Sequence, residues 1–307
     1  MIVIHTAVSL NSLKYYEFLR NNYSNLSSGK HSIIHKAYCL DKKSFHKLKK
    51  NESLKEVIFC GDVKGSYGHA LAINQALKTL VPNSINIISD TDIAIVFQNW
   101  DRLLFDLLNK NVQCSVLGTQ LEPIGGFSSG YGKFQQYKQK PTTTWLAISP
   151  RYDFKNLSVL PDKSTFKLIV NKQDSLLYNL PIGHSLVKDT GWQIPKYLND
   201  NKFPYEVLDI VSPKSSNAMV LKGISEYHDE FHYKGKPFLV HQRGSMTHKF
   251  RVDPLSKNFY NSVEEFLGFP NWASRPGYVD IFNGTARRYF RSFKKYFKMI
   301  KNNRFGG

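Results

Sequence analysis

The sequence predicts an α/β fold in which helices flank a mainly parallel central sheet. Short β-branched runs alternate with helical segments over residues 1–120, which is the order of β-α-β units. Polar residues follow several of these runs, where the carboxyl ends of parallel strands form one crevice. The chain has 307 residues, of which 41% are apolar, so it can bury a core as one large domain or two small ones.

The first half of the chain contains most of the regular pattern. Its predicted strands are short, apolar and rich in β-branched residues, and they cover 2–8, 33–40, 57–60, 85–89 and 112–118. Its predicted helices carry apolar residues on one side and cover 13–19, a short basic segment around Phe45 and Leu48, 70–77 and 100–108. A glycine-rich loop at 61–68 precedes the third of these helices.

The second half of the chain is less regular. A helix is expected to begin in the motif Asp189-Thr190-Gly191-Trp192 and to run through Leu198, and strands are expected at 205–211 and 238–241. Residues 122–141 are rich in glycine and polar side chains, which is typical both of a binding segment and of an ordinary surface loop. Residues 158–178 show no decisive pattern.

Two carboxylates end the most apolar of the predicted strands. Asp90 and Asp92 follow residues 85–89 and are separated by one residue. Buried carboxylates are costly unless a cation neutralises them, and their oxygens suit Mg²⁺ or Mn²⁺. The alternative is a pair of turn residues whose side chains hydrogen-bond their own backbone. Other predicted strands also end on polar residues that would share the crevice, namely Thr6, Asp41 and Asp62.

The excess of basic residues indicates which kind of partner the surface attracts. Lysine and arginine number 42 against 24 acidic residues, so the formal net charge is +18 and anionic partners are favoured. The three cysteines, Cys39, Cys60 and Cys114, are widely spaced in apolar stretches, which predicts reduced core residues. The start of the chain lacks a signal-peptide pattern and no run is long enough to span a membrane, so we expect a cytoplasmic protein.

The composition changes near the end of the chain. From Ala286 onward no acidic residue occurs, and aromatic residues recur at helical spacing among eight basic ones: Arg287, Arg288, Arg291, Lys294, Lys295, Lys298, Lys301 and Arg304. This pattern predicts a basic amphipathic helix that lies on the inner face of an anionic membrane. The alternative is a helix that packs on its own domain through its aromatic stripe and leaves its basic face in solvent.

Several segments together resemble a known enzyme family. Residues 87–92 resemble a metal-binding Asp-x-Asp motif at a strand end, and residues 65–76 resemble the glycine-rich helix start that precedes it. Asp41, Asp189-Thr190-Gly191-Trp192 and His241-Gln242-Arg243-Gly244 follow in a matching order. In this respect the chain resembles the GT-A fold glycosyltransferases, and family 2 of the nucleotide-sugar-dependent enzymes in particular. The resemblance covers residues 1–250.

The resemblance implies a domain plan and a set of roles. Residues 1–120 would bind the nucleotide sugar, residues 121–250 would bind a glycan or lipid-linked acceptor, and residues 251–307 would be a C-terminal extension. The metal, Mn²⁺ or Mg²⁺, would be held by Asp92, Asp90 and His241, with His248 as a substitute for His241. The nucleotide-diphosphate sugar would be contacted by Thr6, Asp41, Gly65, His69, Asn74, Asp90 and Arg243. Taken alone, His241 also fits a core histidine, and Arg243 also fits a surface ion pair.

An inverting transfer needs a general base, and Asp189 is the predicted one. The alternative is that Asp189 caps a helix that starts at Thr190. His228 and His232 have the spacing of a zinc helix, but a turn follows them, so we do not predict a zinc site there.

Two other functions compete with sugar transfer. A nucleotidyltransferase would need a glycine-rich basic loop after the first strand, and residues 7–11 contain neither glycine nor arginine. A basic nucleic-acid-binding protein would explain the charge but not the two carboxylates, so nucleic acid is an unlikely partner on this reading.

Overall fold

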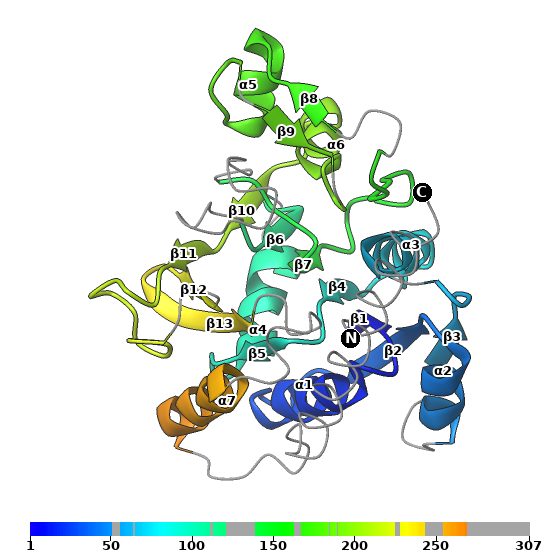
Figure 1. Ribbon diagram of the computed structural model, residues 1–307, viewed down its shortest axis with the longest axis vertical. Helices are drawn as coiled ribbons and strands as arrows, with labels where there is room; N and C mark the ends of the chain where they lie inside the picture. The colour runs from blue at the N-terminus through cyan, green and yellow to red at the C-terminus, as the bar shows by residue number, and fades with distance from the viewer. Residues whose placement is uncertain are drawn as a thin grey trace, which may run out of the picture.

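The computed structural model describes residues 1–50, 56–63, 65–110, 113–120, 139–162, 167–183, 185–188, 190–224, 228–242 and 254–268 (Figure 1). The main sheet has seven strands in the order β10 (Tyr205–Val207), β6 (Val116–Gly118), β7 (Trp145–Ile148), β4 (Ile85–Ser89), β1 (Ile2–Val8), β2 (Ile33–Cys39) and β3 (Glu56–Phe59). Only β7 runs against its neighbours, and the other pairs are parallel. The predicted α/β fold with a mainly parallel sheet is therefore confirmed.

Helices cover both faces of this sheet (Figure 1). On one face, α1 (Leu13–Asn25) and α4 (Trp100–Leu104), which continues as the π-helical turn η1 (Phe105–Lys110), pack against Ile85 and Ile87 of β4. On the other face, α3 (Gly65–Lys78) packs against Ile88 of the same strand. Side chains of a strand alternate between the two faces, so β4 is buried from both sides. The short α2 (Lys42–Lys49) lies between β2 and β3 in the chain.

After β4 the chain enters a second, antiparallel sheet. Its order is β11 (Asp209–Val211), β12 (His228–Tyr233), β13 (Lys236–Gln242) and β5 (Ile93–Ile95). Lys234 and Gly235 both have positive φ, which is typical of the two-residue turn that joins β12 to β13. The outer face of this sheet is covered by α7 (Pro254–Leu267), whose Phe259 and Val263 pack against Val240. The chain thus passes from one sheet to the other at residues 90–92.

A small group of elements projects at the top of Figure 1. It contains the hairpin of β8 (Lys167–Ile169) and β9 (Ser185–Val187), together with α5 (Lys172–Tyr178) and α6 (Ile194–Asp200). None of the helices that the structure describes is long and apolar enough to cross a lipid bilayer. The three cysteines are free thiols, and burial raises the pKa of each. Cys39 and Cys114 lie in the core, as predicted, whereas Cys60 is half-buried.

The structure corrects several predicted elements. The strand predicted at 205–211 is two strands in different sheets, because the chain breaks at the buried Leu208, whose amide donates to the carbonyl of Gly118. The strand predicted from residue 112 begins at Val116. The helix predicted from Asp189 begins at Ile194, after the Gly191 turn. The sequence reading also missed β7, β12 and α7. The predicted basic helix at 286–304 and most of the loop at 122–141 lie outside the described residues.

Candidate metal centre

The connection from β4 to β5 fixes the backbone of the two aspartates from both sides. The amide of Asp90 donates to the carbonyl of Thr144, at 2.9 Å, just before β7 begins. The carbonyl of Asp92 accepts from the amide of Gln242, at 3.0 Å, at the end of β13. The motif is therefore held between two sheets, so its carboxylates occupy fixed positions at the carboxyl edge of β4.

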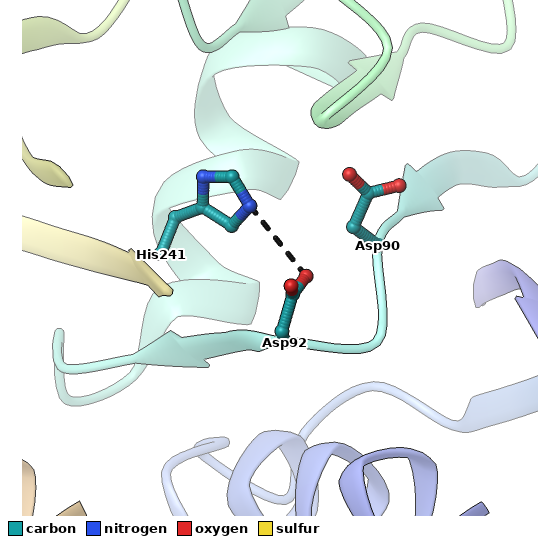
Figure 2. Close-up of side chains that lie close together, drawn as sticks. All are labelled: Asp90, Asp92 and His241. Atoms are coloured by element: carbon teal, nitrogen blue, oxygen red, sulfur yellow. Dashed lines mark ion pairs between the residues drawn. The ribbon is translucent and has the colours of Figure 1, made fainter. Parts of the chain in front are cut away.

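Strand pairing brings His241 to the same place. β13 runs antiparallel to β5, with Val240 opposite Ala94 and His241 opposite Ile93. Since Ile93 directly follows Asp92, His241 lies beside that aspartate although the two residues are far apart in the sequence. Figure 2 shows the side chains of Asp90, Asp92 and His241 pointing into one space from the β4–β5 connection and β13.

The geometry of these three residues, here called the Asp-Asp-His cluster, suits a divalent cation. One ligand atom from each of Asp90, Asp92 and His241 lies within 4.8 Å of the others. His241 Nε2 is 3.5 Å from Asp92 Oδ1, and both side chains are largely buried (Figure 2). Two facing carboxylates repel each other unless a positive charge lies between them. Carboxylate oxygens with one imidazole nitrogen form a donor set that Mn²⁺ and Mg²⁺ accept, so the residues fit such an ion.

The pKa of His241 reflects the negative charge of the carboxylates around it. Burial alone would lower the pKa of its imidazole. The nearby carboxylates of Asp92 and Asp229 outweigh this effect and raise the pKa to about 10. The cluster is thus a strongly anionic, largely buried environment that attracts a cation.

The amino end of α3 approaches the cluster. His69 Nε2, in the early part of this helix, lies 2.9 Å from Asp90 Oδ1. Gly65 begins the helix with φ +73°, a conformation that favours glycine. A Cβ at Gly68 would come within 2.7 Å of the Val63 carbonyl, so the loop packs tightly against the helix only with glycine there. The free amides of a helix start bind anions, and these lie near the Asp-Asp-His cluster.

Three other predicted residues are buried or already engaged by the fold. Asp41 accepts from the amides of Leu10, at 2.7 Å, and Ser44, at 2.8 Å, and so caps α2. Asn74 Oδ1 accepts from the amide of Val159 at 3.3 Å. Thr6 is buried in β1, and its Oγ1 has no hydrogen-bond partner among the described residues.

Three more predicted residues, Asp189, Arg243 and His248, lie outside the described residues. Near the first of them, a Cβ at Gly191 would come within 2.9 Å of Thr143 Cγ2, so the 190–192 turn packs beside the segment that holds Asp90. Helix α6 has Gln193 at its N-cap, so no helix starts at Thr190. The capping role that competed with the catalytic role of Asp189 is therefore wrong.

Sequence reasoning missed Asp229. This residue lies on β12, opposite His241 on β13, and its Oδ2 is 3.3 Å from His241 Nδ1. A hairpin reading of 228–242 around the Lys234-Gly235 turn could have placed it near His241. With unbroken pairing from that turn, however, Asp229 would face Val240. The bulge between Phe231 and His232 shifts the register by one residue and brings Asp229 opposite His241.

No protein-family model matches the chain, and no curated protein sequence matches it. Solved structures with a partly similar fold include an active-site variant of LgtC, with 11% identity over 50% of this chain and 60% of that one, at a TM-score of 0.33. The mannosyltransferase PcManGT from Pyrobaculum calidifontis, in complex with GDP-Man and Mn²⁺, has 10% identity over 48% of this chain and 44% of that one, at 0.34.

A third similar structure is glucosyl-3-phosphoglycerate synthase from Mycobacterium tuberculosis with phosphoglyceric acid, with 10% identity over 88% of this chain and 81% of that one, at a TM-score of 0.39. The chain spans less than two thirds of the first two proteins, 60% and 44%. Because these TM-scores are all below 0.5, the function of this chain has to follow from its own residues.

Proposed function

We propose that the chain is a metal-dependent glycosyltransferase that moves a sugar from a nucleotide-diphosphate donor to a glycan or lipid-linked acceptor. The observation that carries the proposal is the Asp-Asp-His cluster, whose ligand atoms lie within 4.8 Å of one another at the carboxyl edge of a mainly parallel sheet. Ligands of such sheets bind at this edge. The resemblance of residues 65–92 to a glycine-rich helix start followed by Asp-x-Asp supports the same reading.

The proposed roles follow from position. Asp92, Asp90 and His241 hold Mn²⁺ or Mg²⁺, which when bound supplies Lewis-acid stabilisation of the diphosphate leaving group. The amides at the start of α3 bind the diphosphate, because His69 places this helix end against Asp90. Gly65 allows the chain to turn there because its positive φ is a conformation that favours glycine.

Further roles belong to the other residues around the cluster. Thr6 is proposed to contact the nucleotide because its buried Oγ1 has no hydrogen-bond partner among the described residues. Asp41 and Asn74 hold the neighbouring loops through their contacts with backbone amides. Arg243 meets a phosphate, and Asp189 removes the proton of the acceptor hydroxyl. The packing of Gly191 beside Thr143 supports the second of these roles. The basic segment at 286–304 makes peripheral contact with an anionic membrane, which sedimentation with anionic vesicles tests.

The function is tested by thermal unfolding with nucleoside diphosphates, each with and without Mn²⁺. A ligand at 100 times its dissociation constant stabilises the folded state by about 2.7 kcal/mol, so we expect the unfolding temperature to rise by several degrees with one nucleotide. The rise should require Mn²⁺ and should name the nucleotide of the donor.

Other outcomes point elsewhere. A response to nucleoside triphosphates alone would favour a nucleotidyltransferase. A response to nucleic acid that disappears at high salt would favour the nucleic-acid-binding alternative. No rise with any nucleotide and metal would contradict the proposal.

A further inference from the structure

We propose that Asp229 is a positioning residue that orients His241 toward the carboxylates of the metal site. The inference rests on the metal site of the proposed function. Its basis is one chain of contacts: Asp229 Oδ2 is 3.3 Å from His241 Nδ1, and His241 Nε2 is 3.5 Å from Asp92 Oδ1. The imidazole therefore lies between two carboxylates that contact its two different nitrogens.

The strand register holds this arrangement in place. Asp229 and His241 are direct partners across the β12–β13 pair, so their side chains project from the same face of the sheet. This face is turned toward the core of the main sheet and not toward α7, because Phe231 and Leu239, two residues along each strand, both belong to that core. Both polar side chains are almost fully buried there, so the imidazole has little freedom to turn away.

The contact decides which nitrogen faces the metal site. When a cation displaces the proton of Nε2, Nδ1–H would remain as the donor to the Asp229 carboxylate, and the lone pair of Nε2 would be directed toward Asp92 and Asp90. A histidine ligand whose other nitrogen donates to a carboxylate is held in the correct tautomer and orientation. Without Asp229 the ring could rotate or carry its proton on Nε2, and the third ligand would be lost.

The adjacent Glu230 provides a natural control. It is also buried and acidic, but it projects from the opposite face of β12, where its carboxylate accepts from the amides of Met219, Val220 and Leu221. If the loss of any buried charge on β12 weakened metal binding, substitutions of both residues would do so. Of these two residues, only Asp229 contacts His241, so an effect through His241 is expected of Asp229 and not of Glu230.

The test measures the affinity for Mn²⁺ alone, from the electron paramagnetic resonance signal of the free ion, with the full chain. Asp229→Ala is expected to weaken Mn²⁺ binding by about 10- to 100-fold. Asp229→Asn keeps an oxygen that accepts from Nδ1–H and should stay within about threefold of wild type. Glu230→Gln should lower the unfolding temperature without changing the affinity. If the alanine variant does not fold, Asp229→Leu fills the same space without an acceptor.

A double-mutant cycle separates positioning from a general effect. In the His241→Ala background, Asp229→Ala is expected to cause no further loss of Mn²⁺ affinity, because Asp229 acts through the missing imidazole. Equal losses in both backgrounds would overturn the positioning role, and so would an unchanged affinity in Asp229→Ala, while both would leave the proposed function standing. A wild-type chain that does not bind Mn²⁺ would contradict the proposed function together with this inference.

Discussion

Two buried acidic groups of the second sheet, one on β12 and the other just before β5, serve different ends. Glu230 on β12 accepts four hydrogen bonds, from the amides of Met219, Val220 and Leu221 and from His232 Nε2. Asp92, just before β5, has its carboxylate beside another aspartate and His241. The first carboxylate is surrounded by donors, and the second shares its space with a further negative charge.

This difference separates stability from function. A carboxylate surrounded by N–H donors is stabilised by the fold and in turn holds the fold together. Two carboxylates that face each other cost free energy in the absence of a cation, and such arrangements persist at sites that bind one. Burial alone does not distinguish the two cases, because both side chains are largely buried. What distinguishes them is the kind of group that surrounds the oxygens.

The largest expected effect comes from Asp92→Asn. With the donor that the nucleotide panel identifies, sugar transfer should fall by about a thousandfold, or about 4 kcal/mol, because a ligand to the charge-stabilising ion is lost. The free energy of unfolding should change much less than the activity, since the substitution removes both a repulsion with Asp90 and an attraction to the protonated His241. Steady-state kinetics and urea unfolding measure the two effects. Full activity, or a loss of stability as large as the loss of activity, would contradict the comparison.

The second-largest effect is expected from Glu230→Gln, which should lower stability and leave activity unchanged. Glu230→Gln turns one oxygen into an NH₂ group that faces backbone amides, so the free energy of unfolding should fall by about 3 kcal/mol. Transfer activity per folded molecule should stay at the wild-type level. Urea unfolding measures the change, and the exposed Glu265→Gln on α7 is the matched control, expected to shift stability by less than about 0.5 kcal/mol. If Glu230→Gln and Glu265→Gln changed the free energy of unfolding equally, the structural role of Glu230 would be contradicted.

The smallest effect extends the comparison to a buried neutral group. His5 lies between Tyr38 Oη, at 3.0 Å, and Asn86 Oδ1, at 2.9 Å, and burial lowers its pKa to about 4. In the unfolded chain His5 binds a proton near its ordinary pKa of 6.5. Between pH 6.5 and pH 4, His5 is therefore protonated in the unfolded state but neutral in the folded state. Stability should therefore fall as the pH decreases, by about 2 kcal/mol from pH 7 to pH 5 for this residue.

Urea unfolding at pH 7 and pH 5 checks the contribution of His5. His5→Gln should be less stable than wild type at pH 7, yet it should lose about 2 kcal/mol less on acidification. The exposed His46→Gln should keep the wild-type pH dependence. Parallel pH dependences of wild type and His5→Gln would show that His5 is not the group responsible. Burial also lowers the pKa of His35, to about 3, so some acid sensitivity should persist in the variant.

Local pattern was enough to predict most strands of the main sheet. The run Ile2–Val8 consists mainly of β-branched residues, and β1 has those same bounds. The pairing of Asp90 with Asp92 was readable because two carboxylates after a buried strand are unusual in any fold. His241 was also predicted, on a resemblance, and strand pairing places it in the cluster.

Long-range register could not be read from the sequence. Asp229 reaches His241 only because of the bulge between Phe231 and His232. Pro237 pairs with His232 at this point, but a proline in a strand is typical of an edge as well as of a bulge, so it does not specify the shift in register. β7 joins the main sheet in the antiparallel sense, and Trp145 is buried by contacts that come from α1, such as its Nε1 donating to Tyr23 Oη. The contact of Asp41 with the amide of Leu10 was hidden for a similar reason, since Leu10 is 31 positions away.

The central claim is that Asp90, Asp92 and His241 hold one divalent cation. A titration of the full chain with Mn²⁺, followed by the signal of the free ion, tests it directly. The account predicts one ion bound per wild-type chain, a loss of that binding in Asp92→Asn, and unchanged binding in Glu230→Gln. Equal Mn²⁺ binding by wild type and Asp92→Asn would contradict it.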